Sequence, residues 1–259
     1  MDKVVSAPWL AVTLFVGMVV LMETGRRLRL RQIARGLNGE LPGLGTVEAA
    51  VFGLLGLMVA FSFSGAAGRF EFRRDLVVQE ANAIGTAYLR LDLLAPSDQP
   101  ALRARFRSYV DSRLETYRKL PDIEAAEKEL AHTGDIQGEI WTQAIADVRN
   151  PQAQTDSAKL LLPALNDMID ITTTRTMAAR SHPPPILFYL LLGLGFVASL
   201  LAGYGMGNGD RRSWLHVIGF AAVTAIVIFV ILDLEYPRMG YIRLDAYDRV
   251  LVELRNSMK

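Results

Sequence analysis

Four long apolar runs, separated by polar segments, set the hydrophobic pattern of this chain. They cover residues 4–22, 49–68, 183–206 and 213–232 and contain no charged side chains. A helix needs about 20 mostly apolar residues to cross a hydrocarbon core of about 30 Å. Buried helices of a soluble protein are the alternative, but polar residues would interrupt these every turn or two. The pattern therefore predicts four transmembrane helices.

A polar region, residues 69–182, separates the second and third runs and shows helical periodicity throughout. Its first helix is expected from about Phe70 to Leu94, as an unbroken continuation of the second span. No stretch alternates as a strand would. The sequence thus predicts an all-α membrane protein, with four transmembrane helices and an all-helical extramembrane insert between the second and third spans.

Three more helices are expected within this insert. Residues 95–100 form a turn in which Ser97 or Asp98 could cap the next helix, residues 101–120. That helix is basic and amphipathic, so it could lie against lipid headgroups or pack inside the insert equally well. Its apolar side chains recur at three- and four-residue spacing: Leu102, Phe106, Tyr109, Val110, Leu114 and Tyr117.

Prolines and glycines divide the rest of the insert. Pro121 should open a third helix, which the "HTGD" sequence at residues 132–135 could break in two, and a fourth is expected over residues 152–181, interrupted at Pro163. We therefore divide the chain into spans one and two with a basic loop (1–68), the insert (69–182), spans three and four (183–235) and an amphipathic C-terminal tail (236–259).

Small residues gather on the second and third spans. Helices associate in lipid by close approach of their backbones, so such faces predict helix contacts, within one subunit or between subunits. The residues concerned are Gly53, Gly56, Ser62, Ser64, Gly65 and Gly68 on the second span, and Gly193, Gly195, Ser199 and Gly203 on the third.

The arginines give a divided indication of sidedness. Short loops with many arginines favour the cytoplasm, and the expected loops at residues 23–45 and 207–212 carry seven, namely Arg26, Arg27, Arg29, Arg31, Arg35, Arg211 and Arg212. They place the insert outside the cytoplasm. Arginines on the insert's own side of the spans argue against this: Arg69, Arg73, Arg74, Arg175 and Arg180.

Overall composition excludes several function classes. The net charge of +1 over 259 residues gives no basic field for nucleic acid. The absence of cysteine excludes disulfides, thiol catalysis and cysteine-ligated metals. The first apolar run ends in "METGRRLRLR" without a small-residue cleavage site, so we expect a retained signal-anchor in a bacterial inner membrane.

No catalytic constellation stands out. His132, His182 and His216 are scattered, and the motifs of zinc proteases, calcium loops, phosphate loops and serine hydrolases are missing. We expect neither enzyme activity nor a catalytic, cofactor or metal site.

The second span offers a candidate ion path. Ser62, Gly65 and Arg69 fall at three- and four-residue spacing and form a small, hydroxylated track that ends in a cation, with Ser64 nearby. Such a track could line an anion-permeable pore. A serine bonded to its own helix's carbonyl is the simpler alternative.

Charged residues also cluster where three segments leave the membrane on the insert's side. Charges at such a boundary are costly to desolvate and tend to be paired. They predict a belt, either structural or forming the mouth of a pore, that contains Glu80, Asn82, Arg90, Asp92, Arg175, Asp233, Glu235 and Arg238.

Four segments carry a family resemblance: "EANAIGTAYLRLDLL", "VDSRLETYRKL", "ITTTR…SHPPP" and "DLEYPRMG". In this order they resemble the bacterial bestrophin-like membrane proteins. The family's name points to the bestrophins, which are oligomeric anion channels with four spans per subunit and a helical extramembrane part. This likeness of layout would place the insert in the cytoplasm, opposite to the indication from the loop arginines.

The sequence thus leaves two functional hypotheses. The first is an oligomeric integral membrane protein with an ion-channel-like pore that prefers anions. The second is a non-conducting sensor, adaptor or structural module whose insert binds a partner. The expected partners are membrane lipid, further copies of the chain and inorganic ions, and not nucleic acid.

Overall fold

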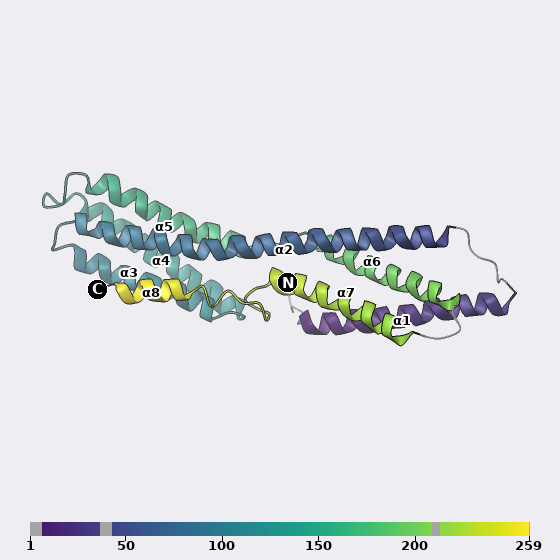
Figure 1. Ribbon diagram of the computed structural model, residues 1–259. Coiled ribbons are helices and arrows are strands. Elements are labelled where there is room, and N and C mark those ends of the chain that lie inside the picture. The colour runs from purple at the N-terminus through teal and green to yellow at the C-terminus, as the bar shows by residue number, and fades with distance from the viewer. Residues whose placement is uncertain (1–6, 37–42, 209–212, 259) are drawn as a thin grey trace. The chain divides into compact units, whose positions relative to one another are not determined.

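The computed structural model describes residues 7–36, 43–208 and 213–258, and all regular structure in these ranges is helical (Figure 1). The chain divides into two compact units. The first contains residues 1–68 and 182–236, and the second contains residues 69–181 and 237–259. The long helix α2 (Leu44–Leu89) supplies residues to both units.

The first unit contains the spanning helices. They are α1 (Ala7–Ala34), the first part of α2, α6 (Pro185–Gly205) and α7 (Trp214–Glu235), with the short 3₁₀ helix η2 (Met206–Asn208) after α6. All four predicted spans are confirmed, since each lies in a helix long and apolar enough to cross a membrane. The beginning of the first predicted run, residues 4–6, lies outside the described residues.

Glycines allow α1 and α6 to approach closely within this unit. A Cβ atom at Gly203 would lie 1.9 Å from the carbonyl oxygen of Met22, and one at Gly25 would lie 2.1 Å from that of Leu200. Only glycine fits at such separations, so part of the small-residue face of the third span serves contacts within one subunit.

The first basic loop is shorter than predicted. We expected it from residue 23, but α1 continues to Ala34, so Arg26, Arg27, Arg29 and Arg31 lie on helical turns. No glycine or proline interrupts residues 26–34, and the helix ends only before Gly36, which has a φ of 80°. An ion pair between Glu23 and Arg27, one turn apart, supports the extension.

The second unit is a helical bundle. It contains the last part of α2, a 3₁₀ turn η1 (Arg90–Leu93), α3 (Gln99–Arg118), α4 (Ile123–Asp147), α5 (Ser157–Arg180) and α8 (Arg249–Ser257) (Figure 1). The expected continuation of the second span as one helix is confirmed by α2. The core joins Ile84 of α2, Phe106 of α3, Ile140 of α4, Leu165 of α5 and Leu251 of α8.

The amphipathic helix α3 packs inside this bundle. Leu102, Phe106, Tyr109 and Val110 are fully buried in its core. Asp98 occupies the N-cap position, as predicted, but its side chain makes no capping bond and instead accepts hydrogen bonds from Ser97 and Asn150.

Two predicted interruptions were wrong. The helix α4 runs through residues 132–135, because Thr133 is fully buried and its hydroxyl bonds to Ser112, while Gly134 meets open space. Tertiary packing outweighs a local glycine penalty of about 1 kcal/mol. The helix α5 likewise continues through Pro163, in its second turn, where a proline removes a single helical hydrogen bond.

Candidate functional site

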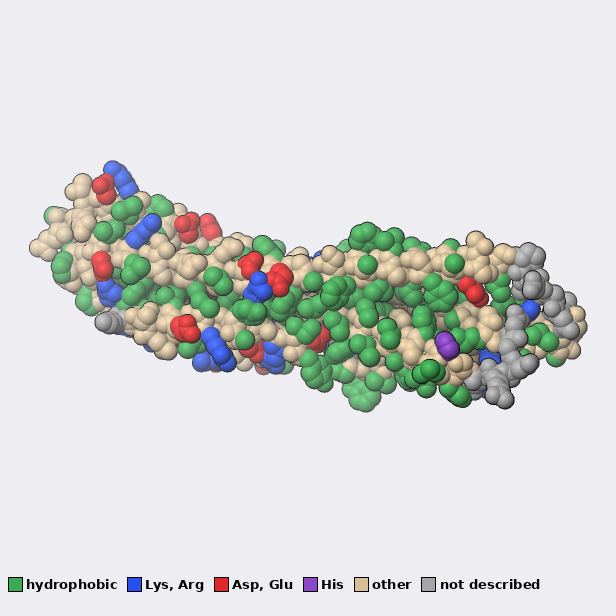
Figure 2. Space-filling view, in the orientation of Figure 1, with side chains coloured by type: hydrophobic (Ala, Val, Ile, Leu, Met, Phe, Trp, Pro, Cys, Tyr) green, Lys and Arg blue, Asp and Glu red, His purple; other side chains and the backbone are tan. Residues whose placement is uncertain are grey.

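The spanning part of α2 is the least covered of the four spans. Only 6% of its most apolar window is buried, against 22–33% for the other three. Its covered face contains Leu55 and Ala66, and Phe52 meets Phe220 of α7 edge-to-face with ring centroids 5.6 Å apart. Figure 2 shows hydrophobic side chains on much of the visible surface around the spanning helices. Most of α2 is therefore free to contact lipid or another molecule.

Three of the four predicted path residues, Ser62, Gly65 and Arg69, share one side of this helix, and Ser64 lies on another face. Ser62 is half-buried and, at about 100° per residue, lies close to the direction of Ala66. Ser64 is exposed, about 200° away. Gly65 and Arg69 are half-buried on one flank. The structure therefore does not join both serines in one track, and only Ser64 lies on the fully uncovered face.

A buried ionic network lies in the second unit. Glu80 of α2 is fully buried and accepts hydrogen bonds from Arg113 of α3, at 2.5 Å from Nε, and from Arg175 of α5. Arg175 also donates to Asp248, 3.0 Å away, which receives two bonds from Arg238 at 2.7 and 2.9 Å. The carboxylate of Glu80 thus connects α2, α3 and α5. The carboxylate of Asp248 connects Arg175 of α5 to Arg238 in the C-terminal segment.

Tyr117 completes this network. The guanidinium carbons of Arg113, Arg175 and Arg238 lie 5.1, 3.9 and 4.3 Å from the centre of its ring, distances typical of cation–π contacts. Its hydroxyl accepts a hydrogen bond from Arg113. We call this set of residues the arginine cluster: Glu80, Arg113, Tyr117, Arg175, Arg238 and Asp248.

The protonation states of the cluster follow from its burial. Burial by itself would lower the pKa of Arg113, but Tyr117 and Glu80 raise that pKa above its usual value, so the guanidinium stays charged. Burial raises the pKa of the neighbouring Tyr109 to about 12, and Glu80 adds to this shift. Tyr109 is therefore neutral and shares a hydrogen bond with Thr172.

Three members of the predicted charged belt meet in this cluster, namely Glu80, Arg175 and Arg238. Two others make different contacts, since Arg90 donates to the carbonyl oxygen of Leu160 and Asp92 pairs with Arg103. The second unit therefore does not gather its predicted charges at one place.

The remaining belt residues are placed as follows. Asn82 is exposed on α2. Asp233 and Glu235 belong to the first unit and are buried, and a carboxylate oxygen of Glu235 lies 3.5 Å from Nδ1 of His182. The ring of His182 also stacks on Tyr236, with centroids 4.5 Å apart.

A family model described as the bestrophin-like domain matches residues 10–245, which is most of the chain. The chain belongs to the bestrophin-like family. No curated protein matches its sequence.

Solved structures show that this bestrophin-like chain has the fold of a bacterial bestrophin homologue. One mutant of the homologue from Klebsiella pneumoniae is 15% identical, with a TM-score of 0.68 over 94% of this chain and 99% of that chain. A second mutant from that organism is 13% identical, with a TM-score of 0.65 over 93% and 98%. A protein described as a membrane protein is 15% identical, with a TM-score of 0.68 over 92% and 95%.

Sequence reasoning missed Arg113, Tyr117 and Asp248 as members of the buried network. The sequence of the bestrophin-like chain did indicate that Arg113 is buried. Arg113 lies on the apolar face of its helix, four residues from both Tyr109 and Tyr117. A charged residue at such a position requires a buried partner. The sequence does not identify Glu80 as that partner.

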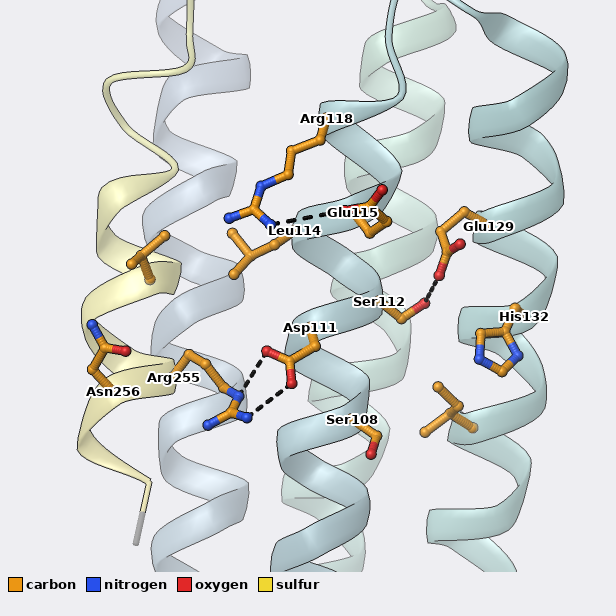
Figure 3. Close-up of a pocket in the computed structure, with 12 residues that line it drawn as sticks. Ser108, Asp111, Ser112, Leu114, Glu115, Arg118, Glu129, His132, Arg255 and Asn256 are labelled. Atoms are coloured by element: carbon orange, nitrogen blue, oxygen red, sulfur yellow. Dashed lines mark hydrogen bonds and ion pairs between the residues drawn. The ribbon is translucent and has the colours of Figure 1, made fainter.

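A polar groove with a volume of about 560 Å³ lies elsewhere on the second unit, along α3, α4 and α8 (Figure 3). Its charged side chains are paired within the chain: Arg255 bonds to Asp111 at 2.7 and 2.9 Å, and Ser112 donates to Glu129. Hydrogen bonds from Lys119 and Ser112 lower the pKa of Glu129. The charged side chains of the groove therefore hold α3, α4 and α8 together, and the groove is not a candidate binding site.

Proposed function

We propose that this bestrophin-like protein is a homo-oligomeric, ion-channel-like membrane pore that prefers anions. The observation that carries the proposal is the uncovered span of α2, in a chain whose relatives of the same fold are named bestrophin homologues. A pore between subunits needs one helix per subunit that its own subunit leaves largely uncovered.

The glycines of α2 support association with further copies. Gly25 and Gly203 are used for contacts inside the subunit, whereas a Cβ atom at Gly53, Gly56 or Gly68 would meet no atom within 4 Å. Faces with small residues allow close helix approach in lipid. The α2 faces of neighbouring subunits can therefore pack without displacing any contact of the subunit.

Ser64 supplies the polar group on the proposed path. It lies on the uncovered face, near the end of the apolar segment that adjoins Arg69, where a hydroxyl can take the place of part of an ion's hydration shell. Exposed Phe61 and Phe63 flank it and would narrow the path.

The preference for anions rests on the charge immediately beyond the span. Residues 69–75 contain three arginines and two carboxylates, Glu71 and Asp75, which gives an excess of 3 − 2 = +1 per subunit. Repetition around an oligomer would produce a positive ring, and such rings favour anions. Arg69 is the first of these charges and the residue that we expect to set selectivity.

Reconstitution in liposomes tests the proposal. Purified oligomers should pass chloride faster than potassium, as read from a chloride-sensitive dye and from the reversal potential under a salt gradient. Arg69→Gln should lower the chloride-to-potassium permeability ratio, whereas the matched control Glu71→Gln, on the exposed face two residues on, should raise it or leave it unchanged.

Absence of flux from intact oligomers would reject the pore and favour the non-conducting module. A permeability ratio that falls in Glu71→Gln but not in Arg69→Gln would contradict the assignment of selectivity to Arg69.

A further inference from the structure

The helix α1 turns one continuous face away from the other helices of its unit. At about 100° per residue, a row of exposed side chains on α1 falls within a sector of about 120°. The buried side chains Leu14, Met18 and Met22 lie on the opposite side of the helix. The row, which we call the outward face, contains Val12, Val16, Val20, Thr24, Arg27 and Arg31.

The outward face changes from apolar to cationic along its length. Val12, Val16 and Val20 are 51–56% exposed, as side chains that contact acyl chains would be. Two turns after Val20, Arg27 and Arg31 take their place, and the Arg27 side chain is 67% exposed. A rise of about 1.5 Å per residue puts Arg27 about 22 Å from Val12, close to half of a bilayer thickness of about 40–45 Å. The face therefore has the length and the polarity of one lipid molecule.

One carboxylate offsets only part of the charge at this end of α1. Residues 23–35 contain five arginines and a single acidic residue, Glu23, which gives a net charge of 5 − 1 = +4. Glu23 pairs with Arg27. Arg31 and Arg35 are exposed and form no ion pair with any residue that the structure describes. Arginines grouped at the end of a span attract anionic lipid.

The arginines of this segment divide between two faces. Arg29 is 4% exposed, and its guanidinium carbon lies 5.7 Å from the ring centre of Tyr204 on α6. Leu28 and Leu30 lie on either side of the outward arginines and are 43% and 38% exposed. Exposed leucines that accompany arginines at the end of a span favour contact with the membrane interface over contact with water. Arg29 thus packs inside the subunit, while the outward arginines face the lipid headgroups.

We propose that the outward face of α1 binds one anionic phospholipid of the surrounding bilayer, of the phosphatidylglycerol or cardiolipin class. An acyl chain lies along the three valines, and the phosphate accepts hydrogen bonds from Arg27 and Arg31. Guanidinium groups match phosphate oxygens in both geometry and charge. A zwitterionic lipid has the same phosphate, but the net positive charge of the segment repels its ammonium group. The site therefore selects lipids by headgroup charge.

This lipid site does not depend on conduction. It lies on α1, whereas the proposed ion path lies on α2. A protein that proves to be non-conducting would still contain the site, and a channel could lack it.

Quenching by brominated lipids tests the proposal. Because the chain contains no cysteine, a single Val20→Cys can carry an apolar bimane fluorophore on the outward face. The full-length protein is reconstituted in phosphatidylcholine vesicles with either brominated phosphatidylglycerol or brominated phosphatidylcholine. Brominated phosphatidylglycerol should quench equally well at about one-tenth of the mole fraction, since each arginine near the surface strengthens the binding of anionic lipid roughly fivefold.

Two variants of the labelled protein assign this preference to the arginines. Arg27→Gln combined with Arg31→Gln should reduce the tenfold preference to about twofold or less. Arg118→Gln on α3 is the matched control and should keep the preference. Its side chain is also 67% exposed and also pairs with a glutamate one turn away.

Three results would overturn the site. The first is equal quenching by the two lipids in the labelled parent, and the second is a preference that persists after both arginines are replaced. The third is resistance to quenching by both lipids, because another copy of the chain would then cover the outward face.

Discussion

At the scale of single residues, the feature that defines the second unit is a carboxylate shared between two buried arginines. Glu80 is held by Arg113 and Arg175, which come from helices far away in the sequence. Burying such groups gains little net stability, but removing one partner leaves the others unpaired at high cost. The network therefore fixes how α2, α3 and α5 meet more than it adds to the free energy of folding.

Replacing Glu80 should destabilise the protein strongly. Glu80→Ala leaves two buried guanidinium groups without their carboxylate, which should cost roughly 3–5 kcal/mol of unfolding free energy. Asn82→Ala changes an exposed residue two positions along and should stay within about 0.5 kcal/mol of the parent. Thermal unfolding in detergent compares the two. Equal melting temperatures would show that the network contributes nothing to stability.

Tyr109 should make stability depend on alkaline pH. Its pKa is raised from about 10 in an unfolded chain to about 12 in the folded protein. The stabilisation is fully present below pH 10 and is lost as the pH rises from about 10 to about 12, because the unfolded chain releases this proton first. The melting temperature of the parent should therefore fall more steeply over this range than that of Tyr109→Phe. Parallel curves would exclude a neutral, buried Tyr109.

The sequence predicted the charged residues as a group but not their pairing. Glu80, Arg175 and Arg238 were expected near one another, and the structure places them in one cluster, because three segments converge there. Arg90 and Asp92 were expected with them but bond elsewhere, to Leu160 and Arg103, since a helix rise of about 1.5 Å per residue carries Arg90 about 15 Å beyond Glu80. Partners distant in sequence, such as Asp248, follow from the fold alone.

At the scale of helices, close approach through glycine distinguishes α1 and α6 from α2. Gly203 contacts the backbone of α1, whereas Gly193, on the same helix, faces open space. A small residue in a span therefore does not by itself indicate a helix contact. It makes such a contact only where another helix of the subunit packs against its face.

Two alanine substitutions on α6 should separate these roles. Gly203→Ala places a Cβ atom 1.9 Å from the carbonyl oxygen of Met22, so α1 and α6 must move apart, at a cost of roughly 1–3 kcal/mol. Gly193→Ala meets no atom and should be neutral or slightly stabilising, because alanine favours the helix. Melting temperatures in detergent decide the matter. A neutral Gly203→Ala would contradict the close packing of α1 on α6.

Apolar length predicted the helices better than local helix breakers did. All four spans follow from uncharged runs, because the bilayer imposes their length. The breaks expected at residues 132–135 and at Pro163 do not occur, since buried contacts such as that of Thr133 hold α4 together. Helix ends in the polar insert thus depend on packing that a single sequence does not display.

At the scale of the whole molecule, four spans require the insert and the loop between α6 and α7 to lie on opposite sides of the membrane. The loop arginines favour a cytoplasmic position for that loop, whereas the bestrophin resemblance favours a cytoplasmic insert. The absence of cysteine from the chain makes this question directly testable.

A single cysteine at an exposed turn can report the sidedness. Thr155→Cys lies between α4 and α5, and Ser213→Cys precedes α7, both exposed. With the insert outside the cytoplasm, as the loop arginines indicate, an impermeant maleimide should label Thr155→Cys and not Ser213→Cys in intact spheroplasts. Labelling of Ser213→Cys alone would reverse the orientation, and labelling of both would contradict the single span, α6, between them.

The central claim is that the uncovered face of α2 lines an ion path. Chloride flux through liposomes containing Ser64→Cys, measured before and after a charged thiosulfonate reagent, tests it most directly, with the fully buried Ser199→Cys of α6 as the matched control. We predict a severalfold fall in flux for Ser64→Cys and no change for Ser199→Cys. Complete modification of Ser64→Cys with unchanged flux would contradict the claim.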